Sequence, residues 1–429
     1  MVFKLCYINA EGRKSNGRGL KYSQRYTGGD IRLLVDINIS GAEDIFTEKT
    51  MWFSVKNENA DMLTDETYDA FFLVPLYLAM YFHQDLHIHG KVSKCLYKNA
   101  KWYLEKIFCD FSDDLQPVDI IVDGFASIDE PGHIVGTGIS CGIDSLSTIY
   151  DHYVKEQDPE YKINALFLFN CGTHGDYENP NTHKLFLSRL KQNKAAADDL
   201  HLPIYAIDSN LHAFTHKIGE TKMGFIAIHS CILSMQKAIS KYYISSSGFY
   251  RGIHLYADHY HDLDMAGFCE SYCFPLIYTE HTKLILDGCQ YTRSQKTSNI
   301  ADWDIAQKHL NVCVNSIDGE NCSYCHKCVR TILPLKAMGM LDKFSNVFDI
   351  DAFNKKGKRE VYRVVLNRNK DLYALDNLNF AKEHHMPMPS LFEAYIHLFP
   401  SIIFQSMKKV SRSILGKDKY LALKHMLKK

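Results

Sequence analysis

The sequence predicts an α/β protein built on a Rossmann-like parallel sheet, with a smaller α+β domain before it. Three observations support this fold class. From Pro131 onward, apolar stretches of strand and helix length alternate along the chain, as they do in doubly wound sheets. Ile163–Asn170 is an almost unbroken apolar run, which is typical of a strand buried on both faces of a parallel sheet. Gly132–Tyr150 passes from a short apolar strand through small residues into a helix.

The composition is that of a globular protein with room for two or three domains. The 429 residues are 46% hydrophobic and 23% charged, and the formal net charge is −1. This balance does not favour a broad basic surface for nucleic acid. The longest apolar run, Ala70–Phe82, is too short to span a bilayer, and no secretory signal is recognised. We therefore expect a soluble, cytoplasmic protein without a membrane segment.

We predict three regions, which are an α+β accessory domain over 1–127, the α/β domain over 128–345, and a mostly helical, basic region over 346–429. In the first and second regions, apolar periodicity predicts strands and helices of ordinary length. The expected strands include Ile31–Ile39, Met51–Val55 and Val118–Val122, and the expected helices include Thr67–Leu86, Leu96–Phe111, Thr182–Leu200 and Phe225–Ser240.

The turn Ser140–Ser145, between the strand and helix of Gly132–Tyr150, has the composition of an anion-binding loop. Backbone N–H groups at the start of a helix attract negative charge. Gly142 lets a ligand approach the backbone, and serine hydroxyls can bind phosphate. No Lys follows the glycine, so a Walker A cradle is not expected. An ordinary turn capped by Asp144 or Ser145 is the alternative.

Four cysteines near the end of the α/β region have the spacing of a metal site. Cys313, Cys322, Cys325 and Cys328 follow the pattern C-x8-C-x2-C-x2-C. Four thiolates so placed can surround one tetrahedral Zn²⁺ and leave no open position for catalysis. A disulfide framework is not expected in a cytoplasmic chain. An iron–sulfur cluster is the alternative, although the Cys-Pro that usually follows its ligands is absent.

Together these motifs resemble those of a known enzyme family. Ser140–Ser145 (SCGIDS) is similar to the Ser-Gly-Gly-x-Asp-Ser signature of the PP-loop ATP pyrophosphatases, with Cys141 where that family usually has its first glycine. With the cysteine pattern added, the chain resembles the 7-cyano-7-deazaguanine synthases of queuosine biosynthesis, the QueC-like family. The resemblance covers roughly residues 130–340 and implies a PP-loop (HUP) sheet with a zinc module over 313–328. The flanking regions argue against a plain housekeeping synthase.

The resemblance implies an ATP-dependent ligase that forms a C–N bond and releases AMP and pyrophosphate. A carboxylate such as 7-carboxy-7-deazaguanine would be adenylated, and an amine would then give an amide, which a second activation could dehydrate to a nitrile. Mg²⁺ would bridge the phosphates of ATP, and Asp144 either contacts this ion or caps the helix. Zn²⁺ on the four cysteines would be structural. The ATP-binding candidates are Ser140, Cys141, Gly142, Ile143, Asp144 and Ser145.

Arg293 and Lys296 complete the catalytic candidates, beside Asp144 and Ser145. They fall at the start of an expected helix just before the cysteines, and members of the resembled family have a basic position there. One cation could neutralise charge on the α-phosphate or on the substrate carboxylate. Salt bridges to acidic side chains on a solvent face are an equally good explanation.

Three other segments are candidates for binding. The resemblance implies that the polar turn Cys171–Asp176, after a buried strand, helps to form an adenosine pocket, and a plain surface loop is the alternative. Gly248–Asp264 is a predicted substrate loop without assigned roles; its polar residues are Arg251, His254, Asp258, His259 and His261. His83, His87 and His89 could bind a metal, but no further ligand lies nearby in sequence and surface histidines are favoured.

The flanking regions suggest partners. QueC-like proteins also occur in antiphage defence, where the amine could belong to a protein partner, and domain 1–127 would suit recognition of that protein. The tail Met407–Lys429 has eight Lys or Arg residues against one Asp. Such a tail can contact RNA, acidic protein or lipid, and a solvated terminal helix is favoured. The resembled family also implies a homodimer.

Two other functions stay open at this point. A tRNA sulfurtransferase of the PP-loop type would need a sulfur-carrying thiol, for which Cys141 and Cys171 are the candidates, and a basic RNA surface, which the net charge of −1 does not favour. A non-catalytic nucleotide-binding module, in which Cys141 spoils the cradle, is the third function. Turnover of ATP would distinguish this module from both enzymes.

Overall fold

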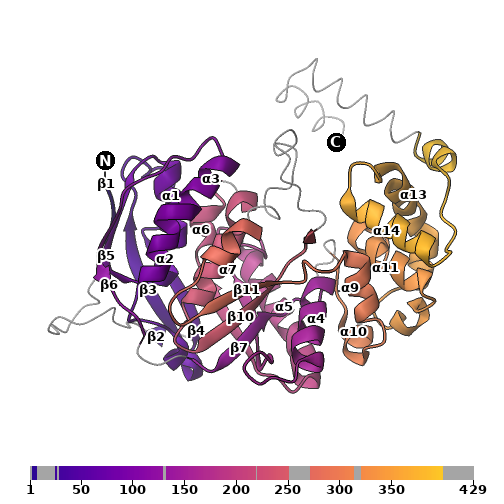
Figure 1. Ribbon diagram of the computed structural model, residues 1–429, viewed down its shortest axis with the longest axis horizontal. Coiled ribbons are helices and arrows are strands. Elements are labelled where there is room, and N and C mark those ends of the chain that lie inside the picture. The colour runs from indigo at the N-terminus through magenta and orange to yellow at the C-terminus, as the bar shows by residue number, and fades with distance from the viewer. Residues whose placement is uncertain are drawn as a thin grey trace, which may run out of the picture. The chain divides into compact units, whose positions relative to one another are not determined.

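The computed structural model describes residues 2–6, 25–26, 29–128, 132–218, 220–250, 271–313 and 320–399 (Figure 1). The chain divides into two compact units. The first comprises residues 1–292, 302–311 and 317–319, and the second comprises residues 293–301, 312–316 and 320–429. Among the described residues, the first unit holds the β-sheet and the second holds the four-cysteine motif and a group of helices.

The described strands of the first unit form one eleven-stranded sheet in the order β11-β10-β7-β8-β9-β4-β3-β1-β5-β6, with β2 paired to β3. Its strands are β1 (Val2–Cys6), β2 (Arg25–Tyr26), β3 (Asp30–Asn38), β4 (Thr50–Lys56), β5 (Asp85–Val92), β6 (Ile120–Phe125), β7 (Ile134–Gly138), β8 (Ala165–Asn170), β9 (Ile204–Ser209), β10 (Ile239–Ser245) and β11 (Lys283–Asp287).

The half of the sheet from β11 to β9 is parallel throughout. All six residues of β8 are buried, as expected for a strand covered on both faces. The prediction of an α/β protein is therefore confirmed. The helices of this half are α4 (Ile143–Ile149), α5 (Pro180–Asp199), α6 (His212–Thr215), α7 (Glu220–Leu233) and α10 (Asp304–His309).

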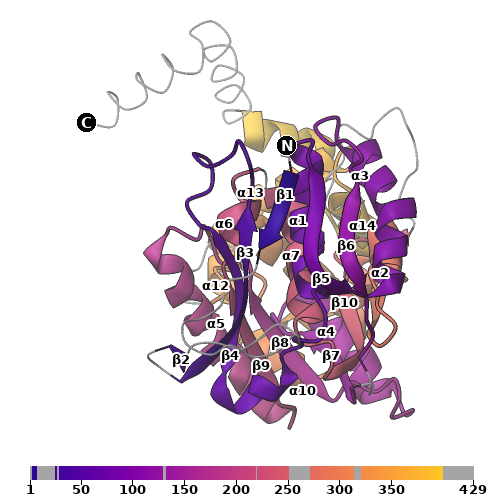
Figure 2. The ribbon, with the colours of Figure 1, turned by 90° about the vertical axis from the view of Figure 1, so that its left-hand side faces the viewer.

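The N-terminal strands extend the same sheet. β4 pairs antiparallel with β9, and the Trp52 N–H donates to Asn210 Oδ1 at 2.9 Å across 158 residues of sequence. Beyond β3, the neighbouring strands β1, β5 and β6 are parallel (Figure 2). The range 1–127, which the sequence set apart, thus shares one sheet and one hydrophobic core with the strands that follow it.

Helix α1 (Leu73–Tyr81) packs against α7 in this core, and α2 (Lys94–Asn99) and α3 (Glu105–Phe111) follow β5. Every residue of α1 from Leu73 to Met80 is buried, so the helix needs no polar face. The buried carboxylate of Asp69 links the two halves of the unit. It accepts hydrogen bonds from the Thr67 hydroxyl at 2.7 Å, the Gln236 amide at 2.8 Å and the Ser93 N–H at 2.7 Å.

Two predicted helices end earlier than their apolar runs suggest. The helix expected over Thr67–Leu86 ends at Tyr81, and Asp85–Val92 forms β5. The helix expected over Phe225–Ser240 ends at Leu233, and β10 begins at Ile239. Buried helices and buried strands are both apolar, so periodicity could not place these boundaries.

The described part of the second unit is helical. Its helices are α9 (Arg293–Asn299), α11 (His326–Ala337), α12 (Ile350–Ala352), α13 (Lys358–Asn367), α14 (Leu372–Glu383) and helix 391–399. Helix α11 contains Pro334 and packs against α14 and α9. The Ser294 N–H donates to Asp376 Oδ2 at 2.8 Å, and the Asn377 amide donates to the Ser294 hydroxyl and the Arg330 carbonyl.

Candidate functional site

The loop Ser140–Ser145 lies at the point of the parallel sheet where the chain changes the side on which it adds strands. From β7 the chain proceeds to β8 and β9 on one side, and then returns to β10 and β11 on the other. The loop joins the carboxyl end of β7 to the first turn of α4. In open α/β sheets, ligands bind in the crevice at this point. The predicted anion-binding loop therefore occupies the position at which open α/β sheets bind their ligands.

The two serine hydroxyls hold the loop in shape. The Gly142 N–H donates to Ser140 Oγ at 3.3 Å, and Ser145 Oγ donates to the Gly142 carbonyl at 3.2 Å. The two hydroxyl oxygens are 3.1 Å apart. A Cβ on Gly142 would lie 3.3 Å from Ser140 Oγ, so glycine leaves room for this close turn. Ser140 and Ser145 thus have a structural role in the loop as well as their predicted ligand role.

Cys141 departs from the resembled signature, and its environment makes it inert. Its φ is +54°, its side chain is buried, and its carbonyl accepts a hydrogen bond from the Asn311 N–H at 2.7 Å. Burial raises the pKa of the Cys141 thiol to about 12, although nearby Arg189 opposes the shift. The thiolate is the reactive form of cysteine. Cys141 therefore presents backbone to the loop, and its sulfur stays protonated in the core.

A cavity of about 300 Å³ adjoins the loop at the carboxyl ends of β7, β8 and β10. Asp144, half-buried in the first turn of α4, lies at its loop side. Its walls are largely aromatic and aliphatic, and polar groups come mainly from the loop and from the turn after β8. Its lining includes Ser140, Asp144, Ser145, Phe167, Cys171, Thr173, Tyr242 and Tyr243. The cavity suits an uncharged ring beside an anionic group.

Asp287, at the end of β11, anchors the helix that carries the loop. Its carboxylate accepts hydrogen bonds from the Thr148 hydroxyl at 2.7 Å and the Gln290 amide at 3.2 Å, and it lies 3.0 Å from His152 Nε2. Burial alone would raise the pKa of Asp287, but the bonds from His152 and Thr148 outweigh it and the pKa is lowered. The His152 ring stacks on Tyr243 with centroids 3.8 Å apart. No sequence motif pointed to this network.

Histidines gather at the turn Cys171–Asp176, for which the resemblance implies an adenosine contact. Cys171 and Thr173 line the cavity. His216 Nδ1 lies 2.8 Å from Asp176 Oδ1, and the rings of His212 and His216 are 5.9 Å apart. Burial lowers the pKa of His174 and of His212 to about 4, so both imidazoles are neutral at pH 7. His212 and His216 were missed because they follow β9, far from the turn in sequence.

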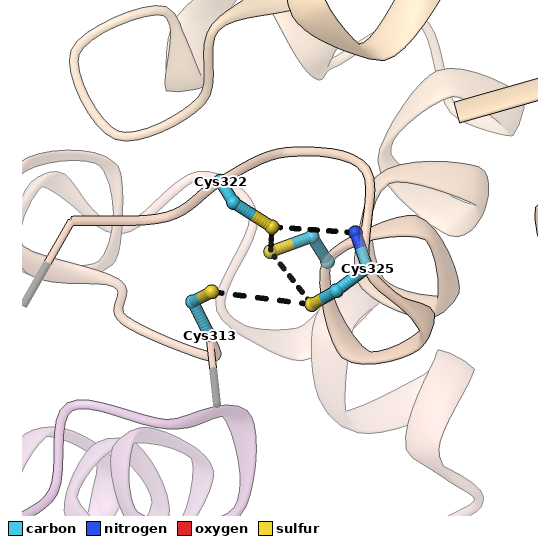
Figure 3. Close-up of side chains that lie close together, drawn as sticks. Cys313, Cys322 and Cys325 are labelled. Atoms are coloured by element: carbon cyan, nitrogen blue, oxygen red, sulfur yellow. Dashed lines mark hydrogen bonds between the residues drawn. The ribbon is translucent and has the colours of Figure 1, made fainter. Parts of the chain in front are cut away.

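The four cysteines come together in the second unit (Figure 3). Their sulfur atoms all lie within 4.8 Å of one another, and three of the sulfur pairs are 3.5–4.0 Å apart. Four sulfurs bound to one zinc at about 2.3 Å would stand about 3.8 Å apart. In the part of the chain that the structure describes, they are the one group of three or more such ligands this close together. The cluster can hold a metal such as zinc.

The local backbone builds this cluster. Asn321 Oδ1 accepts hydrogen bonds from the N–H groups of Val312 and Cys313, at 2.9 and 3.1 Å. The Cys325 N–H donates to Cys322 Sγ at 3.3 Å, as shown in Figure 3. The hydrogen bond between Cys325 and Cys328 lowers the pKa of Cys325 to about 4 and raises the pKa of Cys328.

Arg293 and Lys296 lie on α9 in the second unit, and both side chains are buried. Their burial excludes the alternative in which they form salt bridges on a solvent-exposed face. Their action on the α-phosphate or the substrate carboxylate stays a prediction. His83 has a left-handed backbone, and His87 and His89 lie on β5, so the three do not share a helical face. Residues 251–264 of the predicted substrate loop and the tail 407–429 lie outside the described residues.

Comparison of the chain with models of protein families, with curated proteins and with solved structures finds no match. The family resemblance therefore rests on the motifs and on their placement in the fold. Among the described residues, no helix is both long enough and apolar enough to cross a membrane.

Proposed function

We propose that this protein is an ATP-dependent ligase that activates a carboxylate as its adenylate and transfers the acyl group to an amine. The observation that carries the proposal is the position of Ser140–Ser145 after β7, where the strand order of the parallel sheet reverses, beside the cavity. A loop in this position offers backbone N–H groups and the amino end of α4 to an anion. The leaving pyrophosphate is the group whose developing charge such a loop would stabilise.

In this proposal, a carboxylate oxygen attacks the α-phosphorus of ATP, and the bond from that phosphorus to the bridging oxygen of pyrophosphate breaks. Asp144 is the candidate for contacting Mg²⁺, because its carboxylate lies in the first turn of α4 at the edge of the cavity. The amine nitrogen then forms a bond to the acyl carbon, the bond from that carbon to the AMP oxygen breaks, and the nitrogen loses one proton to solvent. Arg293 and Lys296 remain candidates for neutralising the phosphate or carboxylate.

The carboxylate we propose is of the 7-carboxy-7-deazaguanine type, since a planar heteroaromatic ring suits the aromatic walls of the cavity. The acceptor we propose is ammonia or, as the resemblance to antiphage-associated QueC-like proteins suggests, an amine of a protein partner. Zn²⁺ held by Cys313, Cys322, Cys325 and Cys328 would be structural, because four thiolates saturate it. The protonated, buried thiol of Cys141 disfavours the alternative of sulfur transfer at this residue.

The test measures pyrophosphate and AMP released from ATP by zinc-loaded protein, with and without 7-carboxy-7-deazaguanine and ammonium. The variants are Asp144→Ala and, as a matched control, Asp198→Ala, which removes an exposed carboxylate paired with Lys194 on α5. We expect release that depends on the deazapurine, falls at least 100-fold in Asp144→Ala, and is unchanged in Asp198→Ala.

Mass spectrometry of the product then distinguishes amide, nitrile and protein conjugate. Tight ATP binding without pyrophosphate release under any condition would instead favour the non-catalytic nucleotide-binding module. Equal release in Asp144→Ala and wild type would contradict the role given to this carboxylate.

A further inference from the structure

Tyr242 of β10 extends its ring along the neighbouring strand β7 toward the cavity. Gly136 of β7 is its cross-strand partner, and a Cβ on Gly136 would lie 3.2 Å from the Tyr242 ring. A Cβ on Gly138, the last residue of β7, would lie 3.3 Å from the Tyr242 hydroxyl. Gly138 and Tyr242 both line the cavity. The two glycines therefore leave room for the ring, and the hydroxyl lies at the carboxyl end of β7, where the cavity begins.

This hydroxyl is buried without a partner. Tyr242 is 2% exposed, and within the described part of the chain no group forms a hydrogen bond with its hydroxyl. Burial raises the pKa of Tyr242 well above its usual range, so the hydroxyl keeps its proton and can donate it to an acceptor. Ser245, which also lines the cavity, has a buried Oγ that no described residue hydrogen-bonds. Unpaired buried hydroxyls destabilise a protein, and a ligand with acceptor atoms would pair them.

The surroundings of the hydroxyl suit a flat ring. The rings of Phe167 and Phe169 lie with centroids 5.5 and 6.0 Å from that of Tyr242, and all three residues line the cavity. Aromatic walls favour a planar, fused ring system. The volume of about 300 Å³ is at the lower end of the range of about 300–1,000 Å³ that ligand pockets have. The cavity is therefore of a size for one base and not for a whole nucleotide.

We propose that the Tyr242 hydroxyl donates a hydrogen bond to a nitrogen or carbonyl oxygen on the edge of a bound purine-type base, and that it thereby selects such bases for this cavity. This role rests on the proposed function, in which the cavity holds a substrate of the adenylation reaction. The deazapurine acid and the adenine of ATP both present such an edge. A ring without an acceptor would leave the hydroxyl buried and unpaired, and the site would bind it more weakly for that reason.

Isothermal titration calorimetry of the full chain tests this role with three ligands, which are 7-carboxy-7-deazaguanine, ATP and indole-3-carboxylate. The last keeps the fused rings and the carboxylate but has no acceptor on its six-membered ring. Tyr242→Phe removes the hydroxyl and keeps the ring. The matched control is Tyr205→Phe, because the Tyr205 ring also packs on Phe167, with centroids 5.5 Å apart, but lies outside the cavity lining.

We expect Tyr242→Phe to weaken the binding of one of the two bases about tenfold, and the base that loses affinity is the one that the cavity holds. Binding of indole-3-carboxylate to Tyr242→Phe, and of every ligand to Tyr205→Phe, should match wild type. Thermal unfolding of the ligand-free chain gives a second readout. Because Tyr242→Phe removes an unpaired buried hydroxyl, its melting temperature should equal or exceed that of wild type.

Unchanged affinity of Tyr242→Phe for both bases, or an equal loss for indole-3-carboxylate, would overturn the role of the hydroxyl. A lower melting temperature of the ligand-free variant would also overturn it, because the hydroxyl would then stabilise the fold itself. A wild-type chain that binds neither base would overturn it as well. Binding of a base that depends on Tyr242, without release of pyrophosphate under any condition, would contradict the proposed ligase and support this role, so the two failures are distinguishable.

Discussion

Replacing Asp287 with alanine should loosen the helix that carries the predicted phosphate loop. The change removes the acceptor for the Thr148 hydroxyl and for His152 Nε2, at 2.7 and 3.0 Å. Thr148 is 1% exposed, and each buried donor left without a partner costs about 1–3 kcal/mol. The free energy of unfolding of the first unit should therefore fall by about 4 kcal/mol at pH 7. Asp198→Ala, in an exposed ion pair, should change it by less than about 0.5 kcal/mol.

Hydrogen exchange in increasing urea measures this effect unit by unit. Peptides from 134–155 should lose protection in Asp287→Ala, while peptides from 358–383 in the second unit serve as an internal reference. The pH dependence has a definite sign, because the pKa of Asp287 is lowered in the folded protein. Its stabilisation is present above the ordinary carboxyl pKa and is lost as the pH falls through the lowered value. The difference between wild type and variant should therefore shrink below about pH 3.8.

A double-mutant cycle of Asp287→Asn with Thr148→Val isolates the direct bond between them. We expect a coupling energy of about 1–2 kcal/mol, as for a hydrogen bond to a charged group. A coupling below about 0.5 kcal/mol, or an Asp287→Ala protein as stable as wild type, would refute the view that this carboxylate anchors α4.

Three further predictions concern other parts of the molecule. Burial lowers the pKa of His229 to about 4, so the folded protein binds a proton there less readily than the unfolded chain. Acidification from pH 6.5 to 4 should therefore lower the free energy of unfolding of wild type by about 3 kcal/mol more than that of His229→Phe, and urea titrations at both pH values measure this difference. Cys325→Ser should reduce bound zinc, measured by mass spectrometry, from about one ion per chain to a small fraction, whereas Cys95→Ser should not. Gly136→Ala would place a Cβ 2.5 Å from the buried Phe167 ring, so thermal unfolding should show a loss of about 1–3 kcal/mol, and an unchanged melting temperature would contradict this packing.

The local motifs were predictable because their information is contiguous. The C-x8-C-x2-C-x2-C spacing fixes four sulfurs on a short piece of chain, and the structure gathers all four within 4.8 Å. The strand, turn and helix around Ser140–Ser145 follow from small residues between two apolar runs, and β7 and α4 lie where these runs predict. The all-buried β8 likewise follows from its unbroken apolar sequence.

Long-range pairings left no local trace. Strand β4 pairs antiparallel with β9 through partners such as Phe53 and Ser209. The sequence of neither strand predicts the other as its partner, because backbone hydrogen bonds do not depend on side-chain identity. The prediction of one helix over Thr67–Leu86 was wrong because no Gly or Pro between Tyr81 and Asp85 marks the point where α1 ends and β5 begins.

The sequence by itself therefore determined the α/β fold class, the four cysteines that gather in one cluster and the strand, turn and helix around Ser140–Ser145, since each depends on residues close together in the chain. Only the tertiary structure decided that the N-terminal strands extend the same sheet, that Asp287 and His152 anchor α4, and that His212 and His216 reach the turn after β8. These features depend on which strands become neighbours. That choice is made by the free energy of burying the whole core, to which every apolar face in the unit contributes.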